Sequence, residues 1–384
     1  MAVGFCSLGC VAEAERVADF CVALLYNLKE NVPLEPGAPG DALAEYDSLE
    51  TVQALEDALL AGGHRVIALE GDLNLYETLR RRREDIDIAF NICEGHQGDS
   101  RESQVPFLLE MLGIPYAGSR VLAHAISLDK PICKRVLRDY GLPTAPFQVF
   151  HRSDEPLDSQ LQFPLFVKPS HEGTGMGISA RSVVEDEAAL RERVRWVIRR
   201  YQQAALVEVY LPGREFAVGV LGNGRVSGLP PPSEFYNEAG FHVFPVLELD
   251  TSTCLGEDRG VYNTGAKSVG LGQPGAPLCL CPAPIDATLE WELKRLAVAA
   301  FQAIGALDVS RVDFRLDAKG QPQIMEINTL PGLTSGFSDL CLMAEAEGMH
   351  YTALINEILN LAANRWELIC DLGMSSCPAD MAWL

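Results

Sequence analysis

The sequence contains no Cys-x-x-Cys pair, although it has 11 cysteines. Only Cys6 and Cys10, and Cys279 and Cys281, lie close together along the chain. An odd number of cysteines without paired spacing is not typical of a zinc site or a disulfide framework. The cysteine pattern therefore predicts reduced thiols and favours a cytoplasmic location.

The sequence also lacks long apolar runs and has few basic residues. No stretch reaches the ~18 consecutive apolar residues of a membrane span. The opening "MAVGFCSLGCVAEAERVADFC" has no basic leading region, so we expect no signal peptide. Lysine and arginine total 31 against 53 acidic residues, which gives a net charge of −22. Such a chain would repel nucleic acid and anionic lipid, so neither is an expected partner, and an anionic ligand would need a local cationic site.

The chain has 384 residues, of which 48% are apolar, and this is enough to form the cores of two or three domains. The first hundred residues predict a small parallel α/β unit. Two apolar runs, "CVALLYN" and "HRVIALE", flank a segment with helical spacing at Val52, Leu55 and Leu59. A second helix near residues 74–83 leads into the apolar "DIDIAFNI". Helices between such strands favour a sheet covered on its faces.

The rest of the chain changes character near residue 121. Before that point "SQVPFLLEMLG", and just after it "LDKPICKRVLRDYG", predict helices that end at glycine. Strands then come in pairs, and the expected ones are "FPLFVKPS", "MGISARSVV", "AALVEVYL" and "REFAVGVLG", followed by a hairpin within residues 311–328. Further helices are expected near residues 185–201, 286–304 and 350–363.

The hairpin places unusual charges on one face. Period-two alternation puts Arg311, Asp313 and Arg315 on one side of the first strand, and Glu326 and Asn328 share a side of the second. A four-residue turn over residues 318–321 would set Asp313 across from Glu326, a like-charge pair that a cation between them would relieve. Two carboxylates and an amide oxygen suit Mg²⁺. The alternative is a solvated face on which the two arginines neutralise the acids.

A second candidate is Lys168, which ends an apolar strand just before the glycine-rich "HEGTG". Glycines let backbone N–H groups approach phosphate oxygens, and the lysine adds positive charge. The spacing does not match a Walker A loop, so a glycine-rich hairpin with a surface lysine stays open. Lys130 and Lys134 lie four residues apart on a predicted helix, a spacing that is usual for solvated side chains.

Five motifs occur in order along residues 88–362: "GIPYAGS", "SLDKPICKRVL", "FPLFVKPSHEGTGMGIS", "LVEVYLPGREFAVGVLG" and "RVDFRLDAKGQPQIMEINTLPGLTS". Together they resemble the ATP-grasp superfamily, and within it the D-alanine–D-alanine ligase group. The resemblance implies a mixed α/β and α+β chain, in which an ATP-grasp fold follows an N-terminal parallel α/β (pre-ATP-grasp) domain. The expected parts are an extension (1–20), the N-terminal domain (21–120), central (121–208) and C-terminal (209–365) ATP-grasp subdomains, and a tail (366–384).

The resemblance also implies roles for single residues. Lys130 and Lys168 would bind the phosphates of the nucleotide, and a loop containing Glu172, Gly173, Thr174, Gly175 and Gly177 would cover them. The adenine would be bound by Glu208, Val209, Tyr210 and Leu211, and the ribose by Glu215. Asp313, Glu326 and Asn328 would bind Mg²⁺, with Mn²⁺ as an alternative metal. Lys267 would reach the γ-phosphate, Arg311 and the Gly332 N–H would face the reacting carbonyl oxygen, and Thr174 would help to close the site.

The implied reaction is ATP-dependent amide formation between amino acids or similar substrates through an acyl phosphate. ATP and Mg²⁺ are the expected cofactors. The expected partners are small-molecule substrates, either amino acids or peptides, and the expected assembly is a homodimer. Two alternatives stay open: a true D-alanine–D-alanine ligase of cell-wall synthesis, and a nucleotide-binding regulatory protein without catalysis. The intact set of Lys168, Arg311, Asp313, Glu326 and Asn328 argues against the second.

Departures from the family pattern gather at the substrate positions. The usual Gly-Gly-x-Ser-x-Glu loop is missing, and neither Glu30 nor Glu45 lies in a matching motif, so we assign neither to the site. Ser268 stands where an aromatic residue is common, and Phe337 where a serine binds the acceptor carboxylate. The sequence therefore predicts that D-alanyl-D-alanine is not the main product.

Overall fold

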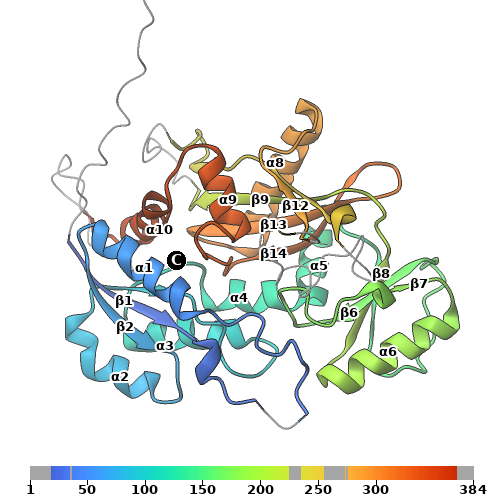
Figure 1. Cartoon of the computed structure of the whole chain (residues 1–384), viewed down its shortest axis with the longest axis horizontal. Helices are drawn as coiled ribbons and strands as arrows, with labels where there is room; N and C mark the ends of the chain where they lie inside the picture. Colours follow the sequence, from blue (N-terminus) through green and yellow to red (C-terminus); the bar gives the residue numbers. More distant parts are fainter. Residues whose placement is uncertain (1–18, 35–36, 225–234, 255–272, 274–275, 370–384) are drawn as a thin grey trace, which may run out of the picture.

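The computed structural model describes residues 19–34, 37–224, 235–254, 273 and 276–369. These residues form three β-sheets with helices packed on them (Figure 1). Within the described residues, none of the helices combines the length and the apolar character needed to cross a membrane. The mixed α/β and α+β class expected from the sequence is confirmed, whereas the expected domain limits stay predictions.

The N-terminal unit is a parallel sheet of order β2-β1-β3-β4. Its elements are β1 (Cys21–Tyr26), α1 (Leu49–Ala61), β2 (Arg65–Glu70), α2 (Leu75–Arg82), β3 (Ile88–Asn91), α3 (Gln104–Leu112) and β4 (Tyr116–Ala117). Successive residues of β1 point to opposite faces, so Val22 and Leu24 pack with α1 while Ala23 and Leu25 pack with α2 and α3. The predicted parallel unit is confirmed.

The central unit holds the antiparallel sheet β5-β8-β6-β7. Its elements are α4 (Val121–Leu128), α5 (Lys130–Asp139), β5 (Phe147–Phe150), β6 (Leu165–Pro169), β7 (Val183–Val184), α6 (Glu187–Tyr201) and β8 (Ala205–Val209). The strand expected over "MGISARSVV" is wrong except for β7. Its first residues turn instead, because Met176 and Ile178 donate backbone N–H bonds to Gly173 and Gly175.

The C-terminal unit is a six-stranded sheet of order β12-β11-β9-β13-β14, with β10 paired to β9. Its elements are β9 (Glu215–Gly222), β10 (Phe241–Val243), β11 (Leu247–Asp250), β12 (Leu278–Leu280), α8 (Ala287–Ile304), β13 (Val309–Leu316), β14 (Pro322–Asn328), α9 (Asp339–Ala346) and α10 (Tyr351–Arg365). One apolar face of this sheet packs against α8. The other carries the charged residues of the predicted hairpin.

Asp313 and Glu326 pair across β13 and β14, as predicted, although the turn differs from the expected one. Leu316 pairs with Pro322, which leaves five residues, 317–321, in the turn rather than four. An irregularity after Asp313 shifts the register by one residue and brings Glu326 opposite it. The sheet therefore places both acids on one face in spite of the longer turn.

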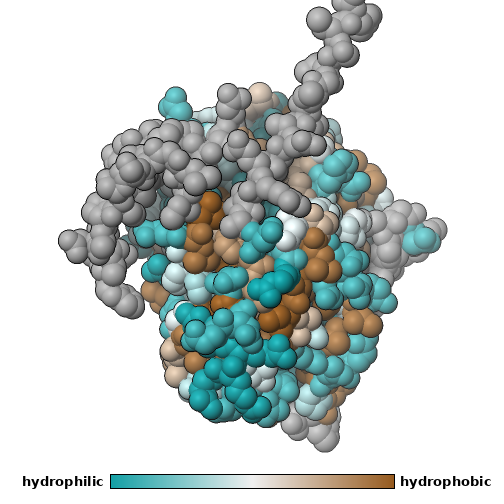
Figure 2. All heavy atoms as spheres, turned by 90° about the vertical axis from the view of Figure 1, so that its left-hand side faces the viewer, coloured by the Kyte–Doolittle hydropathy of each residue, from teal (hydrophilic) through white to brown (hydrophobic). Residues whose placement is uncertain are grey.

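Asp308, fully buried, ties the N-terminal and C-terminal units together. Its carboxylate accepts bonds from the Gly118 N–H (2.8 Å), from Asn223 (2.8 Å) and from Arg365 of α10 (2.7 Å). α10 also packs on α1, so one apolar core extends across both units. Figure 2 views this side of the molecule, where apolar residues lie among polar ones. These contacts fix the position of the N-terminal unit relative to the C-terminal unit.

Candidate active site

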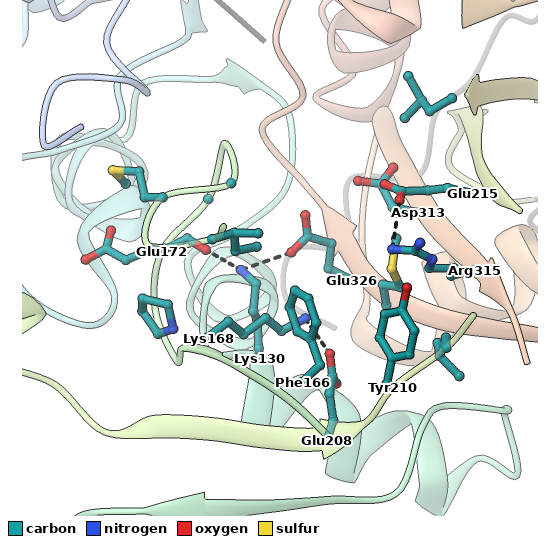
Figure 3. A pocket seen from close by; sticks show the side chains of 18 of the residues that line it. Lys130, Phe166, Lys168, Glu172, Glu208, Tyr210, Glu215, Asp313, Arg315 and Glu326 are labelled. Carbon is teal, nitrogen blue, oxygen red and sulfur yellow. Dashed lines mark hydrogen bonds and ion pairs between the residues drawn. The ribbon is translucent and has the colours of Figure 1, made fainter. Parts of the chain in front are cut away.

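A cavity of about 880 Å³, partly open to solvent, lies between the central and C-terminal sheets (Figure 3). Most of the residues predicted to bind nucleotide or metal line it: Lys130, Lys168, Glu172, Gly173, Gly175, Glu208, Val209, Tyr210, Leu211, Glu215, Asp313 and Glu326. We call it the first cavity. Sequence positions nearly 200 residues apart are therefore brought to one site.

Two lysines share one buried carboxylate at the wall of this cavity. Lys168 of β6 lies 2.7 Å from Glu208 of β8, and Lys134 of α5 lies 3.0 Å from the same side chain. Burial opposes ionisation of Glu208, but the lysines outweigh it and lower its pKa to about 2. The expectation that Lys134 is solvated is wrong, because α5 packs this face inward and leaves Lys134 only 1% exposed. Two cations on one anion leave a net positive charge for a phosphate.

Lys168→Ala should weaken ATP binding in the absence of any amino acid, because the ammonium group would contact phosphate in the ground state. We expect a loss of about tenfold, the effect of removing one hydrogen bond to a charged group. Calorimetric titration with ATP measures this loss, and the control is Lys294→Ala in α8, a partly exposed lysine that lines neither this cavity nor the metal site. An unchanged affinity for Lys168→Ala would remove this residue from the site.

Lys130 stands at the other side of the first cavity, at the start of α5. Its ammonium group is 3.0 Å from Glu326 and donates to the carbonyl oxygen of Glu172. Burial lowers the pKa of Lys130, but the negative charges of Glu326, Glu45 and Glu102 together outweigh burial, so the pKa is raised. Asp129 caps the helix by accepting a bond from the Ile132 N–H (2.8 Å), which holds Lys130 at this position. The lysine stays charged and links the loop to the hairpin.

The loop over residues 172–177 has the backbone conformation of an anion-binding site. Thr174, Gly175 and Gly177 all have positive φ, at 49°, 71° and 70°. Its N–H groups already bind carboxylates, because Gly173 donates to Glu45 (2.6 Å) and Gly177 to Asp41 (2.9 Å). Gly177 does not line the first cavity, and a side chain there would clash with Pro169. Gly173 and Gly175 remain at the cavity wall.

Asp313, one of the two hairpin acids, is bound by Arg311 and Asn328. Arg311 donates two bonds to Asp313, at 2.7 and 2.8 Å, and Asn328 donates to the same carboxylate at 3.0 Å. Burial raises the pKa of Asp313, and the like charge of Glu326 adds to this, although Arg311 opposes it. A divalent cation would relieve the repulsion, so the oxygens fit Mg²⁺. In the described part of the chain no group of three His, Cys, Asp or Glu side chains could hold a metal. Two carboxylates, one amide and the ATP phosphates would have to share the ion.

A second cavity of about 1390 Å³ adjoins the first and lies against the N-terminal unit. Three predicted catalytic residues, Arg311, Gly332 and Thr174, line it together with Asn328. Lys267 lies outside the described residues. Gly173 and Asp339 line both cavities, so the two meet at this point.

Sequence reasoning missed the acids of the second cavity, which are Glu45, Asp47, Glu94, Glu102 and Asp339. Glu45, which we had left unassigned, forms an ion pair with Arg101 and holds the Gly173 N–H. Arg101 also donates to the carbonyl oxygen of His171 at 2.8 Å. The only signal was position, because Glu45 lies between β1 and α1, at the carboxyl end of the parallel strands where ligands bind in such sheets.

Known proteins with similar sequences and folds identify the class. A family model described as D-ala D-ala ligase C-terminus matches residues 136–360. A D-alanine–D-alanine ligase of Pelotomaculum thermopropionicum is 31% identical over 327 residues, which cover 82% of this chain and 92% of that protein. An uncharacterized protein of Sinorhizobium fredii, y4sG, is 39% identical over 315 residues, or 80% of this chain and 86% of that one.

The fold agrees with these sequences. A crystal structure of the Bacillus anthracis D-alanine–D-alanine ligase complexed with ATP matches with a TM-score of 0.66 at 22% identity, covering 91% of this chain and 99% of that one. The fold and its relatives define an ATP-dependent, ADP-forming ligase of the ATP-grasp type. The chain belongs to the D-alanine–D-alanine ligase family, and the resemblance noted in the sequence is confirmed.

Proposed function

We propose that this protein joins the carboxylate of one amino acid, or of a similar substrate, to the amine of another. The supporting observation is the pair of adjoining cavities. One collects the lysines and acids suited to a nucleotide, and the other collects Arg311 and Gly332. An acyl phosphate formed at their junction would stay within reach of both.

The donor carboxylate would attack the γ-phosphorus of ATP, forming a carboxyl oxygen–phosphorus bond while ADP leaves. Lys130 and Lys168 would hold the phosphates, residues 208–211 the adenine, and Glu215 the ribose. Asp313, Glu326 and Asn328 would hold Mg²⁺, which supplies charge neutralisation at the phosphates. Lys267 would add positive charge at the γ-phosphate, and Thr174 would close over the junction.

Arg311 and the Gly332 N–H would then bind the carbonyl oxygen when the amine adds to it. Arg311 is suited to this task because Asp313 holds two of its nitrogens and fixes the direction of the third. Glu45 is already paired with Arg101, so its carboxylate could bind a substrate ammonium group only while it also binds Arg101. The donor would therefore be recognised differently from substrates of relatives that have a dedicated acidic loop.

We propose further that D-alanyl-D-alanine is not the main product. Phe337, 41% exposed, lines the second cavity where the family pattern has a serine for the acceptor carboxylate. The neighbouring Ser338 hydroxyl accepts the Thr334 N–H at 2.9 Å and so is already engaged within its own turn. A hydrogen bond to a charged group contributes ~1.5–3 kcal/mol, so its loss changes preference by about tenfold or more.

Steady-state kinetics with D-alanine alone, against a panel of L- and D-amino acids and dipeptides, tests this proposal. We expect ATP-dependent phosphate release with at least one substrate pair of higher kcat/KM than D-alanine. If D-alanine has the highest kcat/KM and its dipeptide dominates the products, the substrate proposal is wrong. If no substrate releases phosphate, a nucleotide-binding regulatory protein becomes the better account.

We propose a cytoplasmic setting for the reaction. The seven cysteines in the described part of the chain are free thiols, which suits a reducing cytoplasm. We also propose a homodimer, which sedimentation at several protein concentrations would test.

A further inference from the structure

Asp339 occupies a particular place in this site. It is the first residue of α9, and its side chain is 9% exposed. Among the acids that the structure describes, it is the one that lines both cavities. The helix that carries it is anchored, because Leu340 and Met343 are fully buried against β9 at Gly219. The carboxylate is thus held at the junction where the acyl phosphate and the amine would meet.

The carboxylate of Asp339 has unused capacity to accept hydrogen bonds. Among the described residues it forms no hydrogen bond, and its ion-pair partner there is Arg311, whose Nη1 lies 3.4 Å away. That distance is longer than a charge-assisted hydrogen bond of ~2.7–2.9 Å. The Nε and Nη2 atoms of Arg311 are bound to Asp313 instead. A carboxylate buried this far and left without a hydrogen bond calls for a donor that the ligand can supply.

The other acids of the second cavity are placed differently. Glu45 is engaged by Arg101 and the Gly173 N–H, and Glu102 lies 3.8 Å from His124. Asp47 and Glu94 line only the second cavity, on the side of the N-terminal unit. Of the acids that line the second cavity in the described part of the chain, Asp339 is the one that pairs with Arg311, which would hold the reacting carbonyl oxygen.

Amide formation needs a proton acceptor at this place. An aliphatic amine is largely protonated at neutral pH and is not a nucleophile in that form. A general base must lie within hydrogen-bond reach of the ammonium group. We infer that Asp339 is a catalytic residue that binds the acceptor ammonium group and removes its proton, an assignment that rests on the proposed ligase reaction.

One ammonium proton passes to the Asp339 carboxylate, and the freed nitrogen lone pair forms the C–N bond to the acyl carbon. The carbonyl oxygen becomes negative beside Arg311. Collapse of this intermediate breaks the bond between the acyl carbon and the phosphate oxygen, and phosphate leaves with that electron pair and takes up the second proton from nitrogen.

Hydroxylamine separates this role from a structural one, because it is largely unprotonated at neutral pH and needs no base. Wild-type enzyme, Asp339→Asn and Asp339→Glu are each given Mg-ATP and pooled amino acids, with and without hydroxylamine. Amide products and hydroxamates are measured by mass spectrometry. We expect Asp339→Asn to lose ~10²-fold or more of amide formation while hydroxamate formation stays close to the wild-type rate, and Asp339→Glu to recover part of the amide rate.

Glu345→Gln, an exposed acid on the same helix, is the matched control and should leave both products unchanged. Equal loss of amide and hydroxamate in Asp339→Asn would mean that the residue only positions Arg311, and would overturn the inference. Unchanged amide formation in that variant would overturn it as well. If the wild-type enzyme forms neither hydroxamate nor phosphate, the ligase proposal itself fails and this inference with it.

Discussion

Glu326→Gln should abolish turnover while the fold stays intact. The change removes an anionic metal ligand with little change in side-chain volume, and metal ions contribute several kcal/mol to the stabilisation of a transferring phosphoryl group. We therefore expect kcat to fall by at least ~10³-fold. The fold should survive because Glu326 lies at the cavity wall with 23% of its side chain exposed.

Initial rates over a range of Mg²⁺ concentrations test this expectation, with circular dichroism to monitor the fold. Glu215→Gln is a suitable comparison, since it lies in the same cavity but should raise the KM for ATP rather than lower kcat. Near-normal turnover of Glu326→Gln at limiting Mg²⁺ would show that this carboxylate does not bind the metal.

The hairpin shows how much could be predicted from the sequence. Alternation along β13 and β14 indicated which side chains share a face, and this held because one face of the sheet is buried against α8. The exact turn could not be predicted, because a one-residue irregularity compensates for the longer turn. The pairing of Asp313 with Glu326 was right even though the turn was one residue longer than expected.

The buried lysine and the second cavity could not be predicted in the same way. Lys134 was expected in solvent because lysines four residues apart on a helix are usually solvated, whereas its partner Glu208 lies 74 residues further along the chain. Glu45, Glu94 and Glu102 follow different strands or turns and belong to no common motif. They meet because the segments that follow the neighbouring strands β1 and β3 lie at the same edge of the parallel sheet.

Arg311→Lys should lower kcat by ~10²-fold or more, the usual cost of losing one oxyanion donor. Lysine keeps the charge, so Asp313 and Asp339 remain partly neutralised and the variant should fold. It loses the planar guanidinium, of which two nitrogens bind Asp313 and the third lies 3.4 Å from Asp339. Charge without that geometry should not restore the rate.

Arg315→Lys provides the comparison, because Arg315 lies on the same face of β13 but lines only the first cavity, 3.5 Å from Glu215. It should raise the KM for ATP and leave kcat nearly unchanged, whereas Arg311→Lys should do the reverse. Hydroxamate formation should fall along with amide formation in Arg311→Lys, since both pass through the same oxyanion. If Arg311→Lys instead raises only the KM for ATP, Arg311 takes part in nucleotide binding. The proposal that Arg311 stabilises the oxyanion in the second cavity would then be wrong.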